Sequence, residues 1–355
     1  MRIAQVAPLA ERVPPRAYGG TERIVSYLTE ELVRQGHAVT LFASGDSITA
    51  ADLVPGAPAA LRLDPRTTDP IPHHLVLLEQ VRQRASSFDV LHFHIDLFQF
   101  PLLREIRTPA LTTLHGRLDL PDLQPFYRLF DDAALVSISD AQRLPMPPVY
   151  WLGTVHHGLP ADLLAFNGRP EGYLAFLGRI SPEKRPDRAI AIAAKAGVPL
   201  RIAAKIDAAD RDYWNTTIAP LVRDGENVEF VGEIGEDEKG AFLGGAMALL
   251  FPIDWPEPFG LVMIEAMACG TPVIAFPHGS VREIIEDGVT GCLCRTVEEA
   301  AEAVPRAARL DRRAIRARFE ERFTAKRMAE DYIALYRGLS LQARPQPAVL
   351  RRTGS

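Results

Sequence analysis

One stretch of the sequence, residues 248–276, limits the fold more than any other. The apolar run 248–251 predicts a buried strand, and the prolines that follow it predict a loop. Apolar residues then recur at helical spacing over 261–268, and the apolar run 272–276 predicts a second buried strand. The order strand, loop, helix, strand is that of an open parallel sheet. In such a sheet this loop lies at the carboxyl ends of the strands, where ligands bind.

Two glutamates mark this loop and helix: Glu257 lies before the helix and Glu265 lies within it. The helix begins at Gly260, so its first backbone N–H groups and the positive end of its dipole suit a phosphate. Carboxylates do not favour a phosphate themselves, but they accept hydrogen bonds from sugar hydroxyls on either side of it. The alternative is a surface helix with two solvated glutamates, which the Pro-Glu-Pro-Phe-Gly sequence at 256–260 disfavours.

A second polar motif follows the predicted strand 173–177. Arg179 and Lys184 flank the turn between this strand and a predicted helix over 186–196. Two cations at such a turn can neutralise a diphosphate, and the arginine can bind two oxygen atoms at once. For the motif on its own, two solvated basic residues are the alternative interpretation.

The first half of the chain gives a weaker signal. A predicted strand over 2–8 leads to Gly19-Gly20, and a helix with Thr21 as its N-cap follows. Two glycines let a phosphate or a sugar approach the backbone, although a tight turn alone explains them as well. The sequence contains no G-x-G-x-x-G fingerprint, which argues against a dinucleotide cofactor.

Histidines follow or end two of the predicted strands in this half. His92, His94 and Asp96 have a spacing that could suit a metal ion. No further cluster of ligands accompanies them, so we favour histidines that are buried and hydrogen-bonded in the core. His115 lies at the carboxyl end of the next strand, where it either meets a ligand or only forms the turn.

Composition narrows the range of partners and compartments. The 355 residues suggest about two domains, and the net charge of −5 gives no sign of a nucleic-acid partner. Residues 1–165 contain no lysine and no apolar run approaches ~20 residues, so we expect neither a polybasic membrane patch nor a transmembrane segment. Cys292 and Cys294 lack further ligands nearby, which favours buried packing over zinc. Few cysteines and no signal peptide predict a cytoplasmic protein.

Taken together, these motifs resemble those of the retaining glycosyltransferases of family 4, which have the GT-B fold. Glu257 and Glu265 resemble the family's E-x7-E signature, and Arg179 to Lys184 resembles its G-R-x4-K pattern. The sequence around His115 is similar to a motif whose histidine contacts the donor sugar in that family. The resemblance covers nearly the whole chain, but His157 stands where the family has an asparagine, so we carry no site to that position.

The resemblance implies an α/β fold with two Rossmann-like, doubly wound domains that face each other across a cleft. We expect an acceptor-side domain over 1–165 and a nucleotide-sugar-binding domain over 166–323. A last helix over 324–340 would cross back to the first domain. Residues 341–355 are rich in proline and arginine and predict a disordered tail.

The resemblance also implies an activity: a hexose moves, with retention, from a nucleotide-diphosphate sugar to an acceptor hydroxyl. A UDP-sugar is the expected donor, and the acceptor is a small molecule, a glycan or a glycolipid. We take the sequence to lack a D-x-D metal motif, and two cations already face the diphosphate, so we expect no cofactor and no divalent metal. The alternatives are a sugar-nucleotide epimerase or a phosphorylase of the same fold, and a sensor that binds a sugar nucleotide without turnover.

Each expected role is assigned to matching positions of this sequence. The catalytic candidates are Arg179, Lys184, Glu257 and His115. The donor-binding candidates are Gly19, Gly20, Phe259, Gly260, Leu261, Glu265, Lys205 and Gly232. The acceptor-side candidates are His94 and Tyr18.

Overall fold

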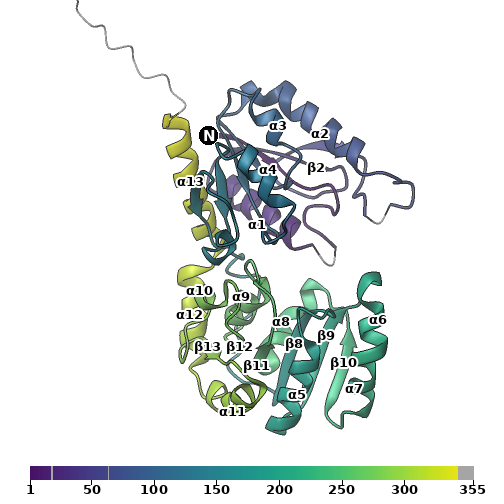
Figure 1. Ribbon diagram of the computed structural model, residues 1–355. Helices are drawn as coiled ribbons and strands as arrows, with labels where there is room; N and C mark the ends of the chain where they lie inside the picture. The colour runs from purple at the N-terminus through teal and green to yellow at the C-terminus, as the bar shows by residue number, and fades with distance from the viewer. Residues whose placement is uncertain (17–18, 63, 343–355) are drawn as a thin grey trace, which may run out of the picture.

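The computed structural model describes residues 1–16, 19–62 and 64–342 of the chain. Two parallel β-sheets form the centres of two stacked halves (Figure 1). The first sheet has seven strands in the order β3-β2-β1-β4-β5-β6-β7, and the second has six in the order β10-β9-β8-β11-β12-β13. Helices pack on both faces of each sheet, which confirms the expected fold of two doubly wound α/β units.

The first half contains the strands β1 Arg2–Val6, β2 Ala38–Ser44, β3 Asp52–Ala57, β4 Val90–Phe93, β5 Ala110–Thr113, β6 Leu135–Ser137 and β7 Trp151–Thr154. Its helices are α1 Gly20–Arg34, α2 Ile71–Arg84, η1 Ala85–Ser87, α3 Phe100–Leu103, α4 Leu123–Leu129 and η2 Ala141–Arg143.

The second half contains the strands β8 Tyr173–Arg179, β9 Leu200–Lys205, β10 Val228–Gly232, β11 Ala246–Phe251, β12 Val273–Ala275 and β13 Gly291–Leu293. The helices up to β11 are α5 Pro186–Ala196, η3 Ala208–Asp210, α6 Arg211–Tyr213, the π-helix η4 Trp214–Ile218, α7 Ala219–Asp224 and α8 Glu236–Gly245. The later helices are α9 Leu261–Ala268, α10 Val281–Ile284, α11 Val297–Ala307, α12 Arg312–Arg322 and α13 Ala325–Gln342.

The strand order reverses once in each sheet, between β1 and β4 in the first and between β8 and β11 in the second. At such a point the connections leave toward opposite faces of the sheet, and a crevice opens at the carboxyl ends of the strands. β11 is buried along nearly its whole length, because helices cover both of its faces. Its carboxyl end lies at this crevice, and the loop that follows it carries Glu257.

The chain crosses between the halves twice, and the two crossings are hydrogen-bonded to each other. Leu159 donates its N–H to the carbonyl of Phe323 at 2.9 Å and accepts from the N–H of Ala325 at 2.7 Å. After the second crossing, α13 runs along the first half, as Figure 1 shows. There Tyr332 and Tyr336 share a core with α1.

Several sequence-based expectations need correction. The loop-rich segment 45–72 predicts one short strand near residues 61–63, but the strand of this segment is β3, which lies at 52–57. The sequence pattern predicts neither β7 nor α8. Thr21 is not the N-cap of α1, because the helix begins at Gly20 and Gly19 occupies the cap position. The sequence also predicts a helix over 209–223, which in the structure is divided into several short helices. Of the expected tail, residues 341 and 342 belong to α13, and the remainder lies outside the described residues.

Candidate active site

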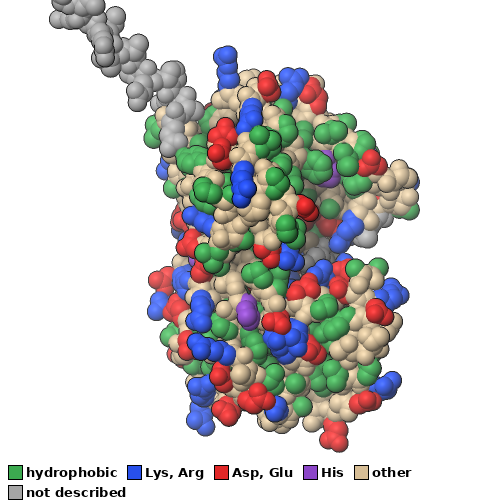
Figure 2. All heavy atoms as spheres, viewed as in Figure 1, with side chains coloured by type: hydrophobic (Ala, Val, Ile, Leu, Met, Phe, Trp, Pro, Cys, Tyr) green, Lys and Arg blue, Asp and Glu red, His purple; other side chains and the backbone are tan. Residues whose placement is uncertain are grey.

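A cavity of about 500 Å³ lies between the two halves, lined by loops at the carboxyl ends of strands from both sheets. Figure 2 shows the hollow between the halves, with charged side chains along its rim. The first half contributes Gly19, Gly20 and His115 to the lining. The second half contributes Arg179, Lys184, Lys205, Glu257, Phe259, Gly260, Leu261 and Glu265. The structure therefore brings most of the predicted site residues together in one place.

Three predicted residues stand apart from this cavity lining. His94 is only 1% exposed and lies behind His115. It does not line the cavity, so the structure does not place it beside an acceptor. Gly232 ends β10, and the residues after it, Glu233 and Ile234, line the cavity in its place. Tyr18 lies outside the residues that the structure describes.

The loop that carries Glu257 is fixed by two glycines. Gly260 has a φ of +79°, and a Cβ there would lie 2.8 Å from the terminal methyl of Met263. Gly279, from the neighbouring loop, has a φ of +58°, and a Cβ there would lie 2.3 Å from the carbonyl oxygen of Glu257. Only glycine permits this backbone conformation and this close approach together. The two loops thus fix the backbone of Glu257.

Glu257 is held within a small polar cluster that faces the cavity. Its Oε2 accepts a hydrogen bond from the indole Nε1 of Trp255 at 3.1 Å and also contacts the Nζ of Lys184. The Lys184 ammonium lies 4.8 Å from the centre of the Trp255 ring, a cation–π distance. Since both contacts are made through Oε2, Oε1 of this carboxylate can serve a ligand. Trp255 was missed in the sequence, although it stands two residues before Glu257.

The cation at the end of β8 is also paired with carboxylates. Arg179 forms an ion pair with Glu183, and its guanidinium lies 3.6 Å from Asp210 and 3.9 Å from Asp207. The Nζ of Lys205, at the end of β9, lies 2.7 Å from Asp207. A diphosphate that enters here has to exchange with these carboxylates. The groups that would receive it are already gathered at the carboxyl end of the sheet.

Glu265 belongs to a chain of charges that reaches the first half. Its Oε1 accepts a hydrogen bond at 2.8 Å from Lys239 of α8, which also lines the cavity. Lys239 lies 3.6 Å from Glu236, which pairs with Arg23 of α1. Lys239 stands on α8, a helix that the sequence pattern does not predict. The carboxylate expected to meet a ribose therefore has a lysine partner that the ribose would have to share or displace.

His115 is backed by a line of buried polar groups. Its Nε2 lies 2.8 Å from Nδ1 of His94, whose Nε2 lies 2.8 Å from the amide oxygen of Gln5. Gln5 in turn donates to the hydroxyl of Tyr336 on α13 at 3.1 Å. Burial lowers the pKa of His115 to about 3, because the charged ring would lose its hydration. His115 is therefore a neutral imidazole at pH 7, oriented by His94.

His157 proves to be part of the site despite its departure from the family pattern. It lines the cavity, is 4% exposed and stacks on His115 with ring centres 5.3 Å apart. Its other face contacts Phe259 at 4.8 Å between ring centres. Burial lowers the pKa of His157 well below its ordinary value, and the nearby His115 lowers it further. No sequence motif predicts this position, because a histidine stands where the family has an asparagine.

Metal-binding groups are not concentrated in the cavity. Within residues 1–16, 19–62 and 64–342, no three His, Cys, Asp or Glu side chains are grouped so as to hold a metal ion. The expectation that the sequence lacks a D-x-D motif is wrong, because Asp210-Arg211-Asp212 is one, although neither aspartate lines the cavity. The three cysteines are free and buried, which confirms the prediction of packing for Cys292 and Cys294. No helix in the described ranges is long and apolar enough to cross a membrane.

Comparison with known families decides what this cleft belongs to. The family model for glycosyl transferases group 1 matches residues 166–323, and the model for glycosyltransferase family 4 matches residues 18–144. The chain belongs to the glycosyltransferases of group 1, family 4. A phosphatidyl-myo-inositol mannosyltransferase of Mycobacterium leprae is 26% identical to this glycosyltransferase over 340 residues, which span 85% of each chain.

Solved structures agree with this glycosyltransferase in fold. The sucrose-phosphate synthase of Thermosynechococcus elongatus has a TM-score of 0.77 at 20% identity, over 96% of this chain and 100% of that one. The Anabaena protein HepE, solved in complex with UDP, has a TM-score of 0.70 at 18% identity, over 95% of this chain and 100% of that one. These similarities confirm the GT-B architecture of the glycosyltransferase.

Proposed function

We propose that this glycosyltransferase moves a hexose from a nucleotide-diphosphate sugar, with UDP as the expected nucleotide, to an acceptor hydroxyl. The transfer retains the anomeric configuration and uses no divalent metal. One observation carries the proposal: a single cavity joins Arg179, Lys184 and the start of α9 on one side to His115 on the other. Cations, a helix N-terminus and sugar-binding carboxylates are the groups that a sugar diphosphate needs.

The donor binds with its diphosphate toward Arg179, Lys184 and the N-terminus of α9. Glu265 accepts hydrogen bonds from the ribose, and Glu257 accepts them from the hexose through the oxygen that Lys184 and Trp255 leave available. Lys205 and the segment after β10 lie where the base would bind. The unliganded cations are neutralised by carboxylates, so binding exchanges one set of ion pairs for another within the same cluster.

The chemical step breaks the bond between the anomeric carbon and the diphosphate oxygen. The acceptor oxygen forms the new bond on the face that the diphosphate leaves, and the acceptor proton passes to the departing phosphate. Negative charge grows on the leaving oxygen, and Arg179, Lys184 and the first N–H groups of α9 stabilise it. Preorganised groups of this kind usually make the largest contribution to catalysis. Neutral His115 hydrogen-bonds the sugar and orients it without adding charge to the site.

The acceptor enters from the first half, beside Gly19 and Gly20. The Mycobacterium leprae relative is a phosphatidyl-myo-inositol mannosyltransferase, and a second relative, from Mycolicibacterium smegmatis, is a D-inositol 3-phosphate glycosyltransferase. Inositol-containing acceptors are therefore the first to test. Free inositol phosphate and phosphatidylinositol vesicles separate a small-molecule acceptor from a lipid acceptor.

The proposal is tested by a ligand screen followed by product analysis. UDP- and GDP-linked hexoses are screened in EDTA for a rise in melting temperature, because a ligand at 100 times its Kd adds about 2.7 kcal/mol to the free energy of unfolding. Mass spectrometry then detects free nucleotide diphosphate together with a new glycoside. Binding that EDTA abolishes would rule out metal independence. An isomerised donor would indicate an epimerase, and binding without any product would indicate a sensor.

A further inference from the structure

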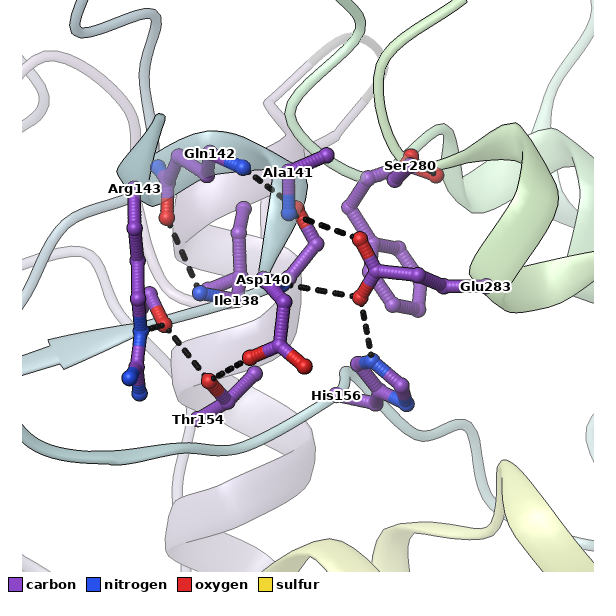
Figure 3. A network of polar contacts seen from close by, with 12 residues as sticks. Ile138, Asp140, Ala141, Gln142, Arg143, Thr154, His156, Ser280 and Glu283 are labelled. Carbon is purple, nitrogen blue, oxygen red and sulfur yellow. Dashed lines mark hydrogen bonds and ion pairs between the residues drawn. The ribbon is translucent and has the colours of Figure 1, made fainter. Parts of the chain in front are cut away.

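Beside the cavity, the two halves are joined by a compact polar contact (Figure 3). Glu283, on α10 of the second half, accepts hydrogen bonds from the backbone N–H groups of Asp140 at 2.8 Å and Ala141 at 2.7 Å. Its Oε2 also lies 3.1 Å from Nε2 of His156. All three donors belong to the first half or to the segment that leaves it. One carboxylate thus holds the two halves together at this point.

The segment 139–142, which receives Glu283, contacts both walls of the cavity. Ser139 is fully buried, and its hydroxyl donates to the carbonyl of Pro258 at 2.7 Å, next to Glu257. Gln142 donates through its side-chain amide to the carbonyls of Leu114 at 2.9 Å and Gly116 at 2.8 Å, on either side of His115. The same four residues therefore hold the loop of Glu257 and the loop of His115.

The other partner in this contact is fixed to the donor-side loop as well. Ser280, which precedes α10, donates its hydroxyl to the carbonyl of Phe259 at 2.8 Å. Its N–H donates to the carbonyl of Glu257 at 3.0 Å. Glu283 is three residues further along the chain, so it cannot move far without pulling this loop. We call residues 139–142 together with Ser280 and Glu283 the clasp.

We propose that Glu283 is a positioning residue, which through the clasp sets the separation between His115 and Glu257 across the cavity. This inference rests on the proposed function, because it concerns the alignment of donor and acceptor for transfer. Glu265, Lys205 and Arg179 lie outside the clasp, and the clasp holds the start of α9 only through the carbonyls of Pro258 and Phe259, so the N–H groups that face the diphosphate are not bonded to it. Glu283 therefore affects the transfer step and not nucleotide affinity.

The chemistry of the contact explains why a carboxylate is needed. Three N–H donors converge on the two oxygens of Glu283, and an ionised acceptor makes the stronger hydrogen bonds. Burial raises the pKa of Glu283, but the bond to His156 and the two backbone bonds outweigh this effect and leave the pKa below its ordinary value. The amide of a glutamine would turn an NH2 group toward one of these donors. Gln should therefore fail to restore the contact, although it fills the same space.

The test compares Glu283→Ala and Glu283→Gln with the control Glu286→Ala. Glu286 lies close by but pairs with Arg318 and Arg322 of its own half. UDP affinity is measured by calorimetry, and kcat and donor KM are measured by nucleotide diphosphate release with the acceptor found in the screen. We expect both Glu283 variants to bind UDP within about twofold of wild type while kcat falls roughly ten- to hundredfold, the range that misalignment of reacting groups produces. Glu286→Ala should match wild type.

The possible outcomes separate the two proposals. Wild-type kcat in Glu283→Ala, or restoration of kcat in Glu283→Gln, would overturn the clasp and leave the proposed function standing. Equal losses of UDP affinity and kcat would also overturn it, because Glu283 would then only support the fold of the second half. A wild-type protein that binds no nucleotide would overturn the proposed function itself. If Glu283→Ala does not fold, Ser139→Ala is used instead, which removes the hydroxyl that donates to Pro258 and accepts from the N–H of Gln142. A lower kcat at unchanged UDP affinity then supports the clasp, whereas an unchanged kcat overturns it.

Discussion

Glu257 and Glu265 are both buried, but they have different partners, from which we expect different roles. Glu257 is bonded to Lys184 and Trp255 near the expected hexose, whereas Glu265 is bonded to Lys239 near the expected ribose. Glu265→Ala should therefore weaken both the full donor and free UDP. Glu257→Ala should spare free UDP and reduce turnover of the full donor. Calorimetry with both ligands decides this, and equal losses of UDP affinity would contradict the assignment.

Lys184 should matter more for the rate than for donor binding. The diphosphate gains something from Lys184 in the bound donor, but a further charge develops on the leaving oxygen in the transition state, and only that extra interaction raises the rate. Removing one such group typically costs about 2.7–4 kcal/mol, so Lys184→Ala should lower turnover roughly a hundredfold to a thousandfold. Single-turnover kinetics at saturating donor measure this. A normal rate at saturation would make Lys184 a binding residue only.

His157 should make stability depend on pH. Burial lowers its folded-state pKa below the ~6.5 of an exposed histidine. As the pH falls through ~6.5, the unfolded chain therefore binds a proton at this residue, whereas the folded protein does not. Stability is therefore lost as pH falls below ~6.5, by up to about 1.4 kcal/mol per pH unit from this group. His157→Asn, the family's residue, should show a smaller loss in urea denaturation between pH 7 and 5.5. Equal losses in the two proteins would show that His157 does not contribute.

At this scale the sequence predicts the charged groups of the site better than their companions. Arg179, Lys184, Glu257 and Glu265 stand in motifs whose spacing reflects the turn or helix they occupy, so their meeting in the cleft follows from the fold. Trp255 contacts Lys184, which is distant in the sequence, and His157 stands where the family has an asparagine, so no local pattern marks either residue. For His94 the prediction and the structure differ. Its position at the end of a strand predicts a residue that lines the cleft, but it is buried behind His115.

Among the elements, the loop of Gly279 has the clearest consequence. Gly279→Ala would require a positive φ of a residue with a Cβ, and that Cβ would overlap the backbone of Glu257. The matched control is Gly288→Ala, where φ is +77° but nothing lies within 4 Å of the added Cβ. Both should lose about 1–2 kcal/mol of stability from the left-handed backbone. Only Gly279→Ala should also lose at least tenfold in kcat, and similar kcat values in the two would contradict the account.

The elements that the sequence predicts well are those buried on both faces. Strands such as β8 and β11 are continuous apolar runs between helices, and α5 begins and ends where its proline and glycine predict. Two of the elements that it misses are the edge strands of the first sheet. β7 is half-buried along its whole length at the edge of the first sheet, and β3, at the other edge, contains Pro55 and Gly56. α8 carries glycines that weaken its helical pattern.

For the molecule as a whole, the active site exists only where the two halves meet. Its donor-side groups come from the second sheet and His115 from the first, and the paired crossings near Leu159 together with the clasp fix one relative to the other. Neither half carries the full set of groups. In the proposed function, sugar transfer, rather than nucleotide binding, is therefore the property that depends on the whole chain.

The stereochemistry of transfer tests the central claim most directly. The wild-type protein is incubated in EDTA with an α-linked nucleotide hexose and the acceptor found in the screen, and the anomeric configuration of the product glycoside is determined by proton NMR. The account predicts an α-glycoside, formed without metal, because the acceptor attacks on the face that the diphosphate leaves. A β-glycoside as the first product, or transfer that occurs only after a divalent metal is restored, would contradict it.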